Sequence, residues 1–276
     1  MIASDTDSIY VRFDELVSMV NPKNPIDFLD TVAKEKIEPF INKSYQQLAD
    51  YVSAYDQKMF MKREVIADKG IWTAKKRYIL NAWDIEGVRY KEPQLKVMGQ
   101  EMVKSSTPAP CRTKMKEAIK IIMSGDEKEF NNFLISFRDE FNKLAPEEIA
   151  YPRSVNGVRK FYSDSSIYRK GTPMHIKGAL VYNHMVRERK LTRKYTLIQN
   201  GDKIKYLELR QPNPLGCNVI TFSAKLPKEL DILKYVDYDS QYEKSFIDPL
   251  SFITNQIGWN IDRSFGTQTT LEDFFA

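Results

Sequence analysis

Two aspartates near the start of the chain have the spacing of a small metal site. Asp5 and Asp7 flank Thr6, and the strand-like run of residues 9–13 follows at once. Because alternate residues of a strand point to the same face, the two carboxylates are expected to present oxygens to one region. Such oxygens suit a hard cation such as Mg²⁺. A polar turn ahead of a strand is the alternative. With so little sequence before Asp5 we expect almost no strand on that side, and hence an incomplete site.

A run of cations is the second candidate. Lys75, Lys76, Arg77 and Tyr78 follow one another inside residues 71–83, which are predicted to form a strand. In a strand, Lys76 and Tyr78 share one face, and Lys75 and Arg77 share the other. One face could then contact a nucleic-acid groove while the other pairs with acids or phosphates. A solvated edge strand protected by lysines is the alternative.

Positive charge is concentrated in one segment, although the net charge is only +5. Residues 151–194 hold eleven Lys and Arg against two acids, Asp164 and Glu188, whereas residues 1–104 hold sixteen of each sign. Tyr and Phe side chains are interspersed among these cations. Such a surplus favours a polyanionic partner, with nucleic acid the first candidate and a solvated face the alternative.

The remaining reactive residue types point away from several other functions. No apolar run reaches the roughly 18 residues of a membrane span, and the N-terminus lacks signal-peptide features, so we expect a soluble, unexported protein. Cys111 and Cys217 have neither metal-ligand nor disulfide spacing and are expected to be reduced thiols. His175 and His184 have no nucleophile signature nearby and are assigned packing or surface roles.

The first candidates must be positioned by strands and one long helix. Apolar residues recur at helical spacing over residues 29–52, after a break at residues 21–25, and Pro39 is expected to kink this helix. Strands are predicted over residues 59–67, 71–83, 88–90 and 95–97, with a hairpin turn at 84–87. Glu64 then lies in the middle of a strand.

A mostly helical region follows. Thr107 as N-cap and Pro108 at the first helical position predict a helix that ends at Gly125. Asp126 and Glu129 predict the start of a second helix, whose apolar stripe contains Phe130, Phe133, Leu134, Phe137, Phe141 and Leu144. A helix over residues 173–189 and a hairpin of residues 195–199 and 204–209 complete the pattern.

The last residues form a small apolar motif. One helical turn would place Leu271, Phe274 and Phe275 on one side, with Gln268 as a polar anchor. This arrangement suits a pocket on another protein. Folding of this tail onto the chain's own core is the alternative.

These motifs resemble those of one enzyme family. Residues 5–8, followed by Ile-Tyr-Val, resemble motif C of family B DNA polymerases, and residues 75–78 resemble the lysine-rich strand that follows the primer in that family. Residues 268–275 resemble the peptide by which replicative polymerases bind their sliding clamp. Residues 96–99 and 104–108 are similar to the polymerases of large tailed bacteriophages. The resemblance extends over essentially the whole chain, but only over the C-terminal third of such an enzyme.

The resemblance implies a role for each acidic residue. Asp7 would bind both catalytic Mg²⁺ ions, Asp5 would lie close by in a supporting role, and Thr6 would hold the turn. The ions would activate the primer 3′-hydroxyl and neutralise the triphosphate and pyrophosphate. Glu64 would lie near this site. Lys62 stands where the phage enzymes commonly have an aspartate, which leaves a metal role for Glu64 open.

The resemblance also implies contacts with primer-template DNA. Lys76 and Tyr78 would sense the primer end from the minor groove, while Lys75 and Arg77 would support the strand or contact phosphates. Residues from Ser105 onward would form the thumb that wraps the product duplex. The residues assigned to DNA binding are Lys75, Lys76, Arg77, Tyr78, Ser105 and Ser106.

No segment of this sequence corresponds to the family's motif A, fingers or exonuclease, so the chain alone is expected to be inactive. We therefore interpret it as the C-terminal subunit of a DNA polymerase split into two polypeptides. It would act with an N-terminal polymerase chain, deoxynucleoside triphosphates and a sliding clamp in the cytoplasm of an infected host cell. The alternative is a non-catalytic DNA-binding and clamp-tethering subunit.

The expected fold class is α+β. Residues 1–104 are predicted to form a partial palm, an antiparallel sheet with one long helix. Residues 105–262 would form a mostly helical thumb with a β-hairpin, and residues 263–276 the clamp-binding tail. Because the partner would complete the palm, we expect this region to expose apolar sheet surface or an open sheet edge.

Overall fold

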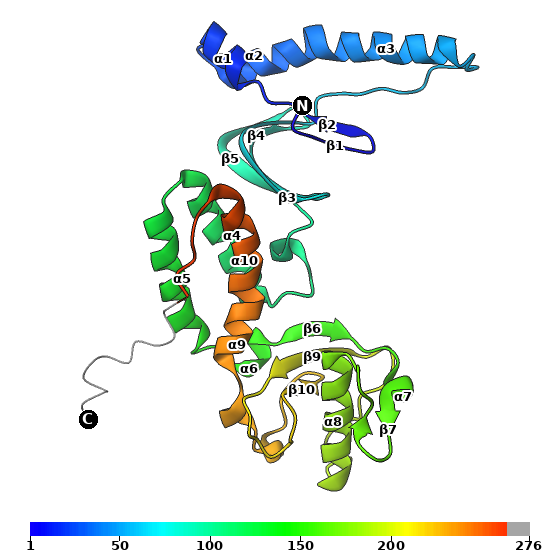
Figure 1. Cartoon of the computed structure of the whole chain (residues 1–276), viewed down its shortest axis with the longest axis vertical. Helices are drawn as coiled ribbons and strands as arrows, with labels where there is room; N and C mark the ends of the chain where they lie inside the picture. Colours follow the sequence, from blue (N-terminus) through cyan, green and yellow to red (C-terminus); the bar gives the residue numbers. More distant parts are fainter. Residues whose placement is uncertain (264–276) are drawn as a thin grey trace. The chain divides into compact units, whose positions relative to one another are not determined.

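The computed structural model describes residues 1–263 and divides into an N-terminal unit, Met1–Gly99, and a C-terminal unit, Gln100–Ala276 (Figure 1). Helices and antiparallel sheets occur in both units, which confirms the predicted α+β class. Within residues 1–263, no helix is long and apolar enough to cross a bilayer. The predicted clamp-binding residues Gln268, Leu271, Phe274 and Phe275 lie outside the described residues.

The N-terminal unit contains two antiparallel sheets. β1 (Ala3–Asp5) and β2 (Ser8–Tyr10) form a short hairpin. β3 (Val65–Ala74), β4 (Arg77–Ile85) and β5 (Val88–Met98) form a three-stranded meander with β4 at its centre. The central strand carries half of the buried apolar side chains described in this unit, including Ile79, Leu80 and Ala82.

An almost continuous helical segment precedes β3. After α1 (Asp14–Val20), α2 (Pro25–Val32) leads through a π-helical turn (Ala33–Ile37) into α3 (Glu38–Tyr51). The π turn ends just before Pro39, which has no N–H to donate to the preceding turn, and π turns are a common response to such a break. The predicted long helix is therefore present with an irregularity near Pro39, whereas α1 was not predicted.

Part of the apolar stripe of this helical segment is exposed in the N-terminal unit, and the rest is half-buried or, at Ala33, buried. Phe40, Leu48 and Tyr51 of α3 are all exposed, and Ala49 is the buried residue of that helix. Apolar side chains are also exposed on the strands, at Ile9, Val88 and Met98, and β3 and β5 are the edge strands of the three-stranded sheet.

Three predictions of strand boundaries were wrong. Residues 59–64 are not in a strand, because β3 begins at Val65. Residues 71–83 do not form one strand, because a turn at Lys75 and Lys76 separates β3 from β4. Residues 88–90 and 95–97 belong to a single strand, β5, whereas the predicted turn at Glu86 and Gly87 is confirmed.

The helical part of the C-terminal unit has an aromatic core. Its first helices are a 3₁₀ turn (Glu101–Val103), α4 (Ala109–Ser124), α5 (Glu127–Phe141) and α6 (Pro146–Ile149). Its last are α9 (Tyr238–Tyr242), a π turn (Glu243–Ile247), α10 (Asp248–Thr254) and a 3₁₀ turn (Asn255–Ile257). Phe137 of α5 packs edge-on against Phe246 with ring centroids 4.6 Å apart. Gly125 ends α4 in the left-handed conformation, and Asp126 caps α5, as predicted.

The other part of the C-terminal unit is a small sheet covered by one helix. Strands β6 (Tyr151–Ser154), β9 (Lys203–Glu208) and β10 (Val219–Phe222) lie in the order β10-β9-β6, and α8 (Met174–Glu188) packs on β10 (Figure 1). A Cβ added at Gly178 of α8 would lie 2.4 Å from Thr221 Oγ1, so this close packing requires glycine. Smaller elements are α7 (Val158–Phe161), β7 (Tyr162–Ser163), β8 (Ile167–Tyr168) and 3₁₀ turns at Lys228–Leu230 and Leu233–Tyr235.

The prediction that residues 195–199 and 204–209 form a hairpin was wrong. Residues 195–199 form no strand, and β9 pairs instead with β6 and β10. The amide of Asn183 on α8 exchanges hydrogen bonds with the backbone of Ile198, so a side chain replaces the expected strand partner.

Candidate functional site

The acidic motif is the turn of the β1–β2 hairpin. Asp5 pairs with Ser8, and Thr6 and Asp7 are the two turn residues, with Thr6 at φ 49°. The Thr6 hydroxyl donates to Asp5 Oδ1 at 3.1 Å, and the Ser8 hydroxyl donates to the Asp5 carbonyl oxygen at 3.1 Å. The expectation that Asp5 and Asp7 share one face of a strand was therefore wrong, and β1 does precede the turn. Asp7 stands exposed at the tip, while Asp5 is half-buried.

The lysine motif is also a hairpin turn. Ala74 pairs with Arg77, so Lys75 and Lys76 form the tip between β3 and β4, and Lys76 has φ 61°. The prediction that Lys75 and Lys76 lie on opposite faces of one strand was therefore wrong. Gly99 lets the end of β5 approach this tip, since an added Cβ would lie 2.5 Å from the Lys76 carbonyl oxygen.

The structure brings the turn of residues 5–8, here called the acidic tip, close to the turn at Lys75 and Lys76, here called the lysine tip. Lys76 Nζ lies 3.7 Å from Asp5 Oδ1. Tyr10 of β2 packs against Trp72 and Tyr78, with ring centroids 5.5 and 5.2 Å apart. Tyr78 is consequently only 8% exposed. Burial, followed by the neighbouring Tyr10 hydroxyl and the charges of Glu64 and Asp5, raises the pKa of Tyr78, so its hydroxyl stays protonated.

Glu64 lies next to these residues but has its own cationic partner. Its carboxylate forms an ion pair with Lys96 of β5, and its carbonyl oxygen accepts a hydrogen bond from Glu86 N at 2.6 Å. Lys62 is exposed. Within residues 1–263, no group of three or more His, Cys, Asp or Glu is arranged to hold a metal ion. The carboxylates of Asp5 and Asp7 fit a hard cation chemically but supply only part of a ligand set.

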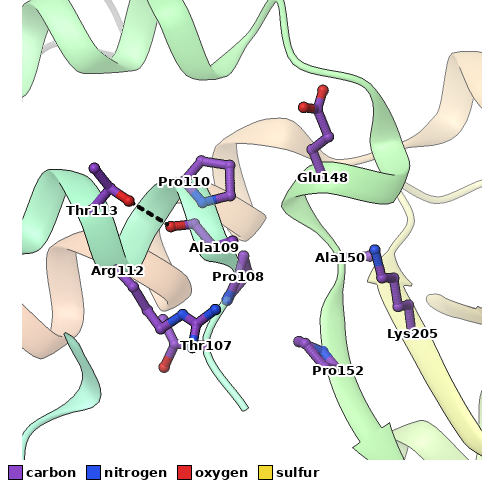
Figure 2. Close-up of a pocket in the computed structure, with 10 residues that line it drawn as sticks. All are labelled: Thr107, Pro108, Ala109, Pro110, Arg112, Thr113, Glu148, Ala150, Pro152 and Lys205. Atoms are coloured by element: carbon purple, nitrogen blue, oxygen red, sulfur yellow. Dashed lines mark hydrogen bonds between the residues drawn. The ribbon is translucent and has the colours of Figure 1, made fainter. Parts of the chain in front are cut away.

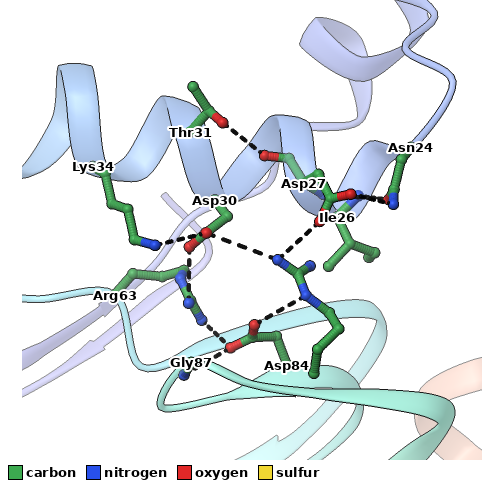
Figure 3. A network of polar contacts seen from close by, with 10 residues as sticks. Asn24, Ile26, Asp27, Asp30, Thr31, Lys34, Arg63, Asp84 and Gly87 are labelled. Atoms are coloured by element: carbon green, nitrogen blue, oxygen red, sulfur yellow. Dashed lines mark hydrogen bonds and ion pairs between the residues drawn. The ribbon is translucent and has the colours of Figure 1, made fainter.

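A network of six charged residues joins α2 to the sheet near the C-terminal end of β4 (Figure 3). At its centre Asp84 is 1% exposed and forms ion pairs with Arg63 Nη1 and, at 3.3 Å, with Arg89 Nε. Arg63 Nη2 pairs with Asp30 of α2 at 2.8 Å. The other members are Asp27 and Lys34. Sequence reasoning missed this network because its members are distant in the chain and match no motif.

The network bears on the site because Arg63 precedes Glu64. Arg63 also donates its backbone N–H to Glu38 Oε1 at 2.8 Å. The start of β3, and with it Glu64, is therefore fixed to both α2 and α3.

In the C-terminal unit, the predicted DNA-binding loop is anchored by one arginine. Ser105 is exposed, and the Ser106 carbonyl oxygen accepts a hydrogen bond from Arg153 Nη1 at 2.8 Å. The Arg153 guanidinium lies 5.8 and 6.0 Å from the rings of Tyr151 and Tyr206, which stack at 5.0 Å. Arg153 is thus used for internal packing rather than presented to solvent.

A pocket of about 370 Å³ lies beside this loop, between the start of α4 and the strands β6 and β9 (Figure 2). It presents the cations Arg112 and Lys205 and the acid Glu148. Lys205 Nζ donates to the Glu147 carbonyl oxygen at 2.7 Å. The full lining is Thr107, Pro108, Ala109, Pro110, Arg112, Thr113, Glu148, Ala150, Pro152 and Lys205. Mixed charge and an open rim make it a polar recess of the surface that carries Ser105.

Most cations of the basic segment, residues 151–194, are exposed. Arg153 and Lys177 are the partly buried members, and Lys177 donates to Asn218 Oδ1 at 2.8 Å. The interspersed Tyr182 is buried in the core of the unit rather than available for stacking. The exposed cations are Arg159, Lys160, Arg169, Lys170, Arg187, Arg189, Lys190, Arg193 and Lys194. This segment therefore has a surplus of exposed positive charge, although Lys194 forms an ion pair with Glu229.

The described residues thus form an α+β chain with an acidic tip beside a lysine tip and a second unit that carries many exposed cations. The chain is 33% identical over 278 residues to the DNA-directed DNA polymerase of Enterobacteria phage T4, a match that covers 94% of this chain and 30% of that protein. It is 36% identical over 274 residues to the DNA-directed DNA polymerase of Escherichia phage RB69, covering 92% and 30% respectively. No protein-family model matches the chain. The chain is thus homologous to one region of these polymerases and spans about 30% of their length.

Proposed function

We propose that this chain is the palm and thumb region of a phage DNA-directed DNA polymerase. Similarity to two such polymerases along more than nine-tenths of the chain carries the proposal. Residues 1–104 would form part of the palm, residues 105–262 the thumb and residues 263–276 a tail that binds a sliding clamp. The reaction would be template-directed nucleotidyl transfer from deoxynucleoside triphosphates to a primer.

In this proposal the acidic tip supplies part of the metal site. Asp7, which is exposed and forms no ion pair within residues 1–263, would be the main ligand, with Asp5 in support and Thr6 holding the turn. Bound Mg²⁺ would activate the primer 3′-hydroxyl and neutralise the triphosphate. Glu64 would lie near the metal site without binding the ion, because its carboxylate is paired with Lys96.

The lysine tip and the C-terminal unit would bind primer-template DNA. Lys76 and Lys75 stand at an exposed turn and can reach phosphates or a groove. The Ser105–Ser106 loop and the exposed cations of residues 151–194 would follow the duplex. Contacts of this kind make affinity fall with salt, so DNA binding alone does not distinguish catalysis from tethering.

The rest of the active site would come from the remaining polymerase region. We propose that this region is a separate N-terminal chain, so that the enzyme is split between two polypeptides. The exposed apolar side chains of α3, including Phe40, Leu48 and Tyr51, support a further protein surface against the N-terminal unit, because such groups favour burial. The alternative function is a non-catalytic subunit that binds DNA and tethers the clamp.

Replacing Asp7 decides between these functions. In the complex assembled from this chain and the remaining polymerase region, Asp7→Asn should lower primer extension by at least about 100-fold, because a metal ligand contributes several kcal/mol to transition-state stabilisation. The Kd for primer-template should change little. The matched control is Asp14→Asn, an exposed carboxylate of α1. Unchanged extension by Asp7→Asn would leave only the tethering function.

The tail is tested separately. Deleting residues 268–275 should shorten the products made with the clamp while leaving extension without the clamp nearly intact. An equal loss with and without the clamp would contradict a tethering role.

A further inference from the structure

The acidic tip belongs to a short hairpin whose backbone is not hydrogen-bonded to the three-stranded sheet within residues 1–263. β1 and β2 have three residues each and form a two-stranded sheet separate from β3, β4 and β5. Hairpins of this size are marginally stable alone. Within residues 1–263, no backbone hydrogen bond joins β1 or β2 to the three-stranded sheet. Side chains must therefore set the position of Asp7 relative to that sheet.

Two kinds of side-chain contact join the β1–β2 hairpin to the β3–β4 hairpin. One is the ion pair of Asp5 with Lys76, at 3.7 Å and with the lysine side chain 64% exposed. Exposed pairs of this kind are weakened by solvent and salt. The other is the packing of Tyr10 against Trp72 and Tyr78, which closes a ring cluster whose third pair, Trp72 and Tyr78, is 6.3 Å apart. The aromatic contact is the one that salt does not screen.

We infer that Tyr10 is a positioning residue, which fixes Asp7 relative to the lysine tip by packing its ring between Trp72 and Tyr78. Tyr10 lies three residues after Asp7 on the same hairpin, and Tyr78 lies two residues after Lys76 on the facing one. A shift of Tyr10 therefore moves the carboxylate with it. This inference rests on the proposed polymerase function and adds a residue that makes no contact with the reacting atoms.

The same geometry refines the role of Tyr78. Its ring is covered by Tyr10 and Trp72, so this hairpin presents the lysines of its tip, Lys75 and Lys76, at its surface rather than Tyr78. Tyr78 then acts through Tyr10 on the position of the acidic tip.

The first experiment measures the cluster without measuring activity. In the full chain with Trp83→Phe and Trp259→Phe, Trp72 is the remaining tryptophan of the three in the sequence. Tyr10→Leu should increase acrylamide quenching of Trp72 by roughly twofold, because the ring that covers it is lost. Tyr10→Phe should keep quenching close to that of the parent, and so should Tyr55→Leu, a change at a fully exposed tyrosine of the same unit. Equal quenching for Tyr10→Leu and the parent would overturn the packing step.

The second experiment measures the chemistry in the assembled polymerase. Tyr10→Leu should lower kcat for single-nucleotide extension by about 10 to 100-fold, since misplacement of a reacting group by about 1 Å has effects of this size. The Kd for primer-template should stay within about twofold, Tyr10→Phe should retain most activity, and Tyr55→Leu, a change at a fully exposed tyrosine, should match the parent.

The outcomes separate this inference from the proposed function. If Asp7→Asn abolishes extension but Tyr10→Leu does not change kcat despite increased Trp72 quenching, the positioning role is refuted and the polymerase function stands. If Tyr10→Leu and Tyr10→Phe lose activity equally, the hydroxyl rather than ring packing is responsible, which also refutes it. If Asp7→Asn leaves extension unchanged, the proposed function itself fails, whatever the quenching result.

Discussion

Removing Asp84 should destabilise the N-terminal unit more than any other change in its charge network. The Asp84→Ala substitution deletes a carboxylate that is 1% exposed, pairs with Arg63 and Arg89 and accepts a hydrogen bond from Gly87 N at 3.0 Å. The Arg63 side chain is only 10% exposed and would be left with Asp30 as its remaining acidic partner in the network. The loss therefore leaves a cation partly uncompensated inside the protein.

The expected loss is about 3 kcal/mol of unfolding free energy. Breaking a buried ion pair by removing one partner costs roughly 3–5 kcal/mol, and the retained Arg63–Asp30 pair places Asp84→Ala at the lower end of that range. For a unit of about 100 residues, each kcal/mol shifts Tm by about 4–8 °C, so the transition should move down by about 12–24 °C. The matched control is Asp27→Ala, at the rim of the same network with its side chain 65% exposed. Its expected cost is below about 1 kcal/mol.

Urea unfolding followed by tryptophan fluorescence measures both variants, because Trp72 and Trp83 lie in the N-terminal unit. A lower midpoint with an unchanged slope would be a true loss of stability. The prediction is refuted if Asp84→Ala and Asp27→Ala lower the free energy of unfolding equally, or if both lower it by less than about 1 kcal/mol. Burial would then not control the strength of this network.

Three further predictions concern other positions. A hydrogen bond from Lys34, opposed by burial and aided by Arg63, lowers the pKa of Asp30 below its ordinary 3.8, so the stability it contributes is present above pH 3.8 and is lost as pH falls through the lowered value; the advantage of wild type over Asp30→Asn in urea should shrink below about pH 3.8. Gly178→Ala should cost roughly 1–3 kcal/mol in the same assay, because the added Cβ would lie 2.4 Å from Thr221 Oγ1, whereas Gly216→Ala meets no atom within 4 Å and tests the backbone cost alone at φ 56°. Burial raises the pKa of the Cys111 thiol to about 11, so a disulfide reagent at pH 8 should label Cys111 far more slowly in the native chain than in urea, and comparable rates would show that this side chain is accessible.

Local signals in the sequence predicted the end of α4 and the start of α5, whereas the predicted start of α4 was wrong, because the N-cap is Pro108 rather than Thr107. Gly125 ends α4, and Asp126 accepts a hydrogen bond from Glu129 N at 2.9 Å to start α5. Both features depend on residues within one turn of the chain, which a sequence displays directly. Most of the apolar stripe of α5 is buried for the same reason, since helical periodicity is a local property.

The errors arose where tertiary structure overrides local preference. The turn at Lys75 and Lys76 contains no Gly, Pro, Asn or Asp, so nothing in residues 74–77 marks a turn. Residues 88–90 and 95–97 form one strand that includes Pro93, because β5 is at the edge of the sheet, where a missing N–H costs little. The N-terminal start of α1 did have a signal, acids at positions 14 and 15, which the preceding strand-like run concealed.

The candidate site combines a predicted part and a part that no sequence pattern contains. Residue types identify Asp5 and Asp7 as a weak metal motif, but the ion pair between Asp5 and Lys76 depends on the meeting of two hairpins whose tips are about 70 positions apart. This contact leaves the two carboxylates in different surroundings. Asp5 is already occupied by Thr6 and Lys76, whereas Asp7 projects from the tip with its carboxylate exposed. A cation that approaches from a neighbouring protein surface would therefore meet Asp7 first, and the remaining ligands would have to come from that surface, because residues 1–263 supply no third carboxylate to such a group.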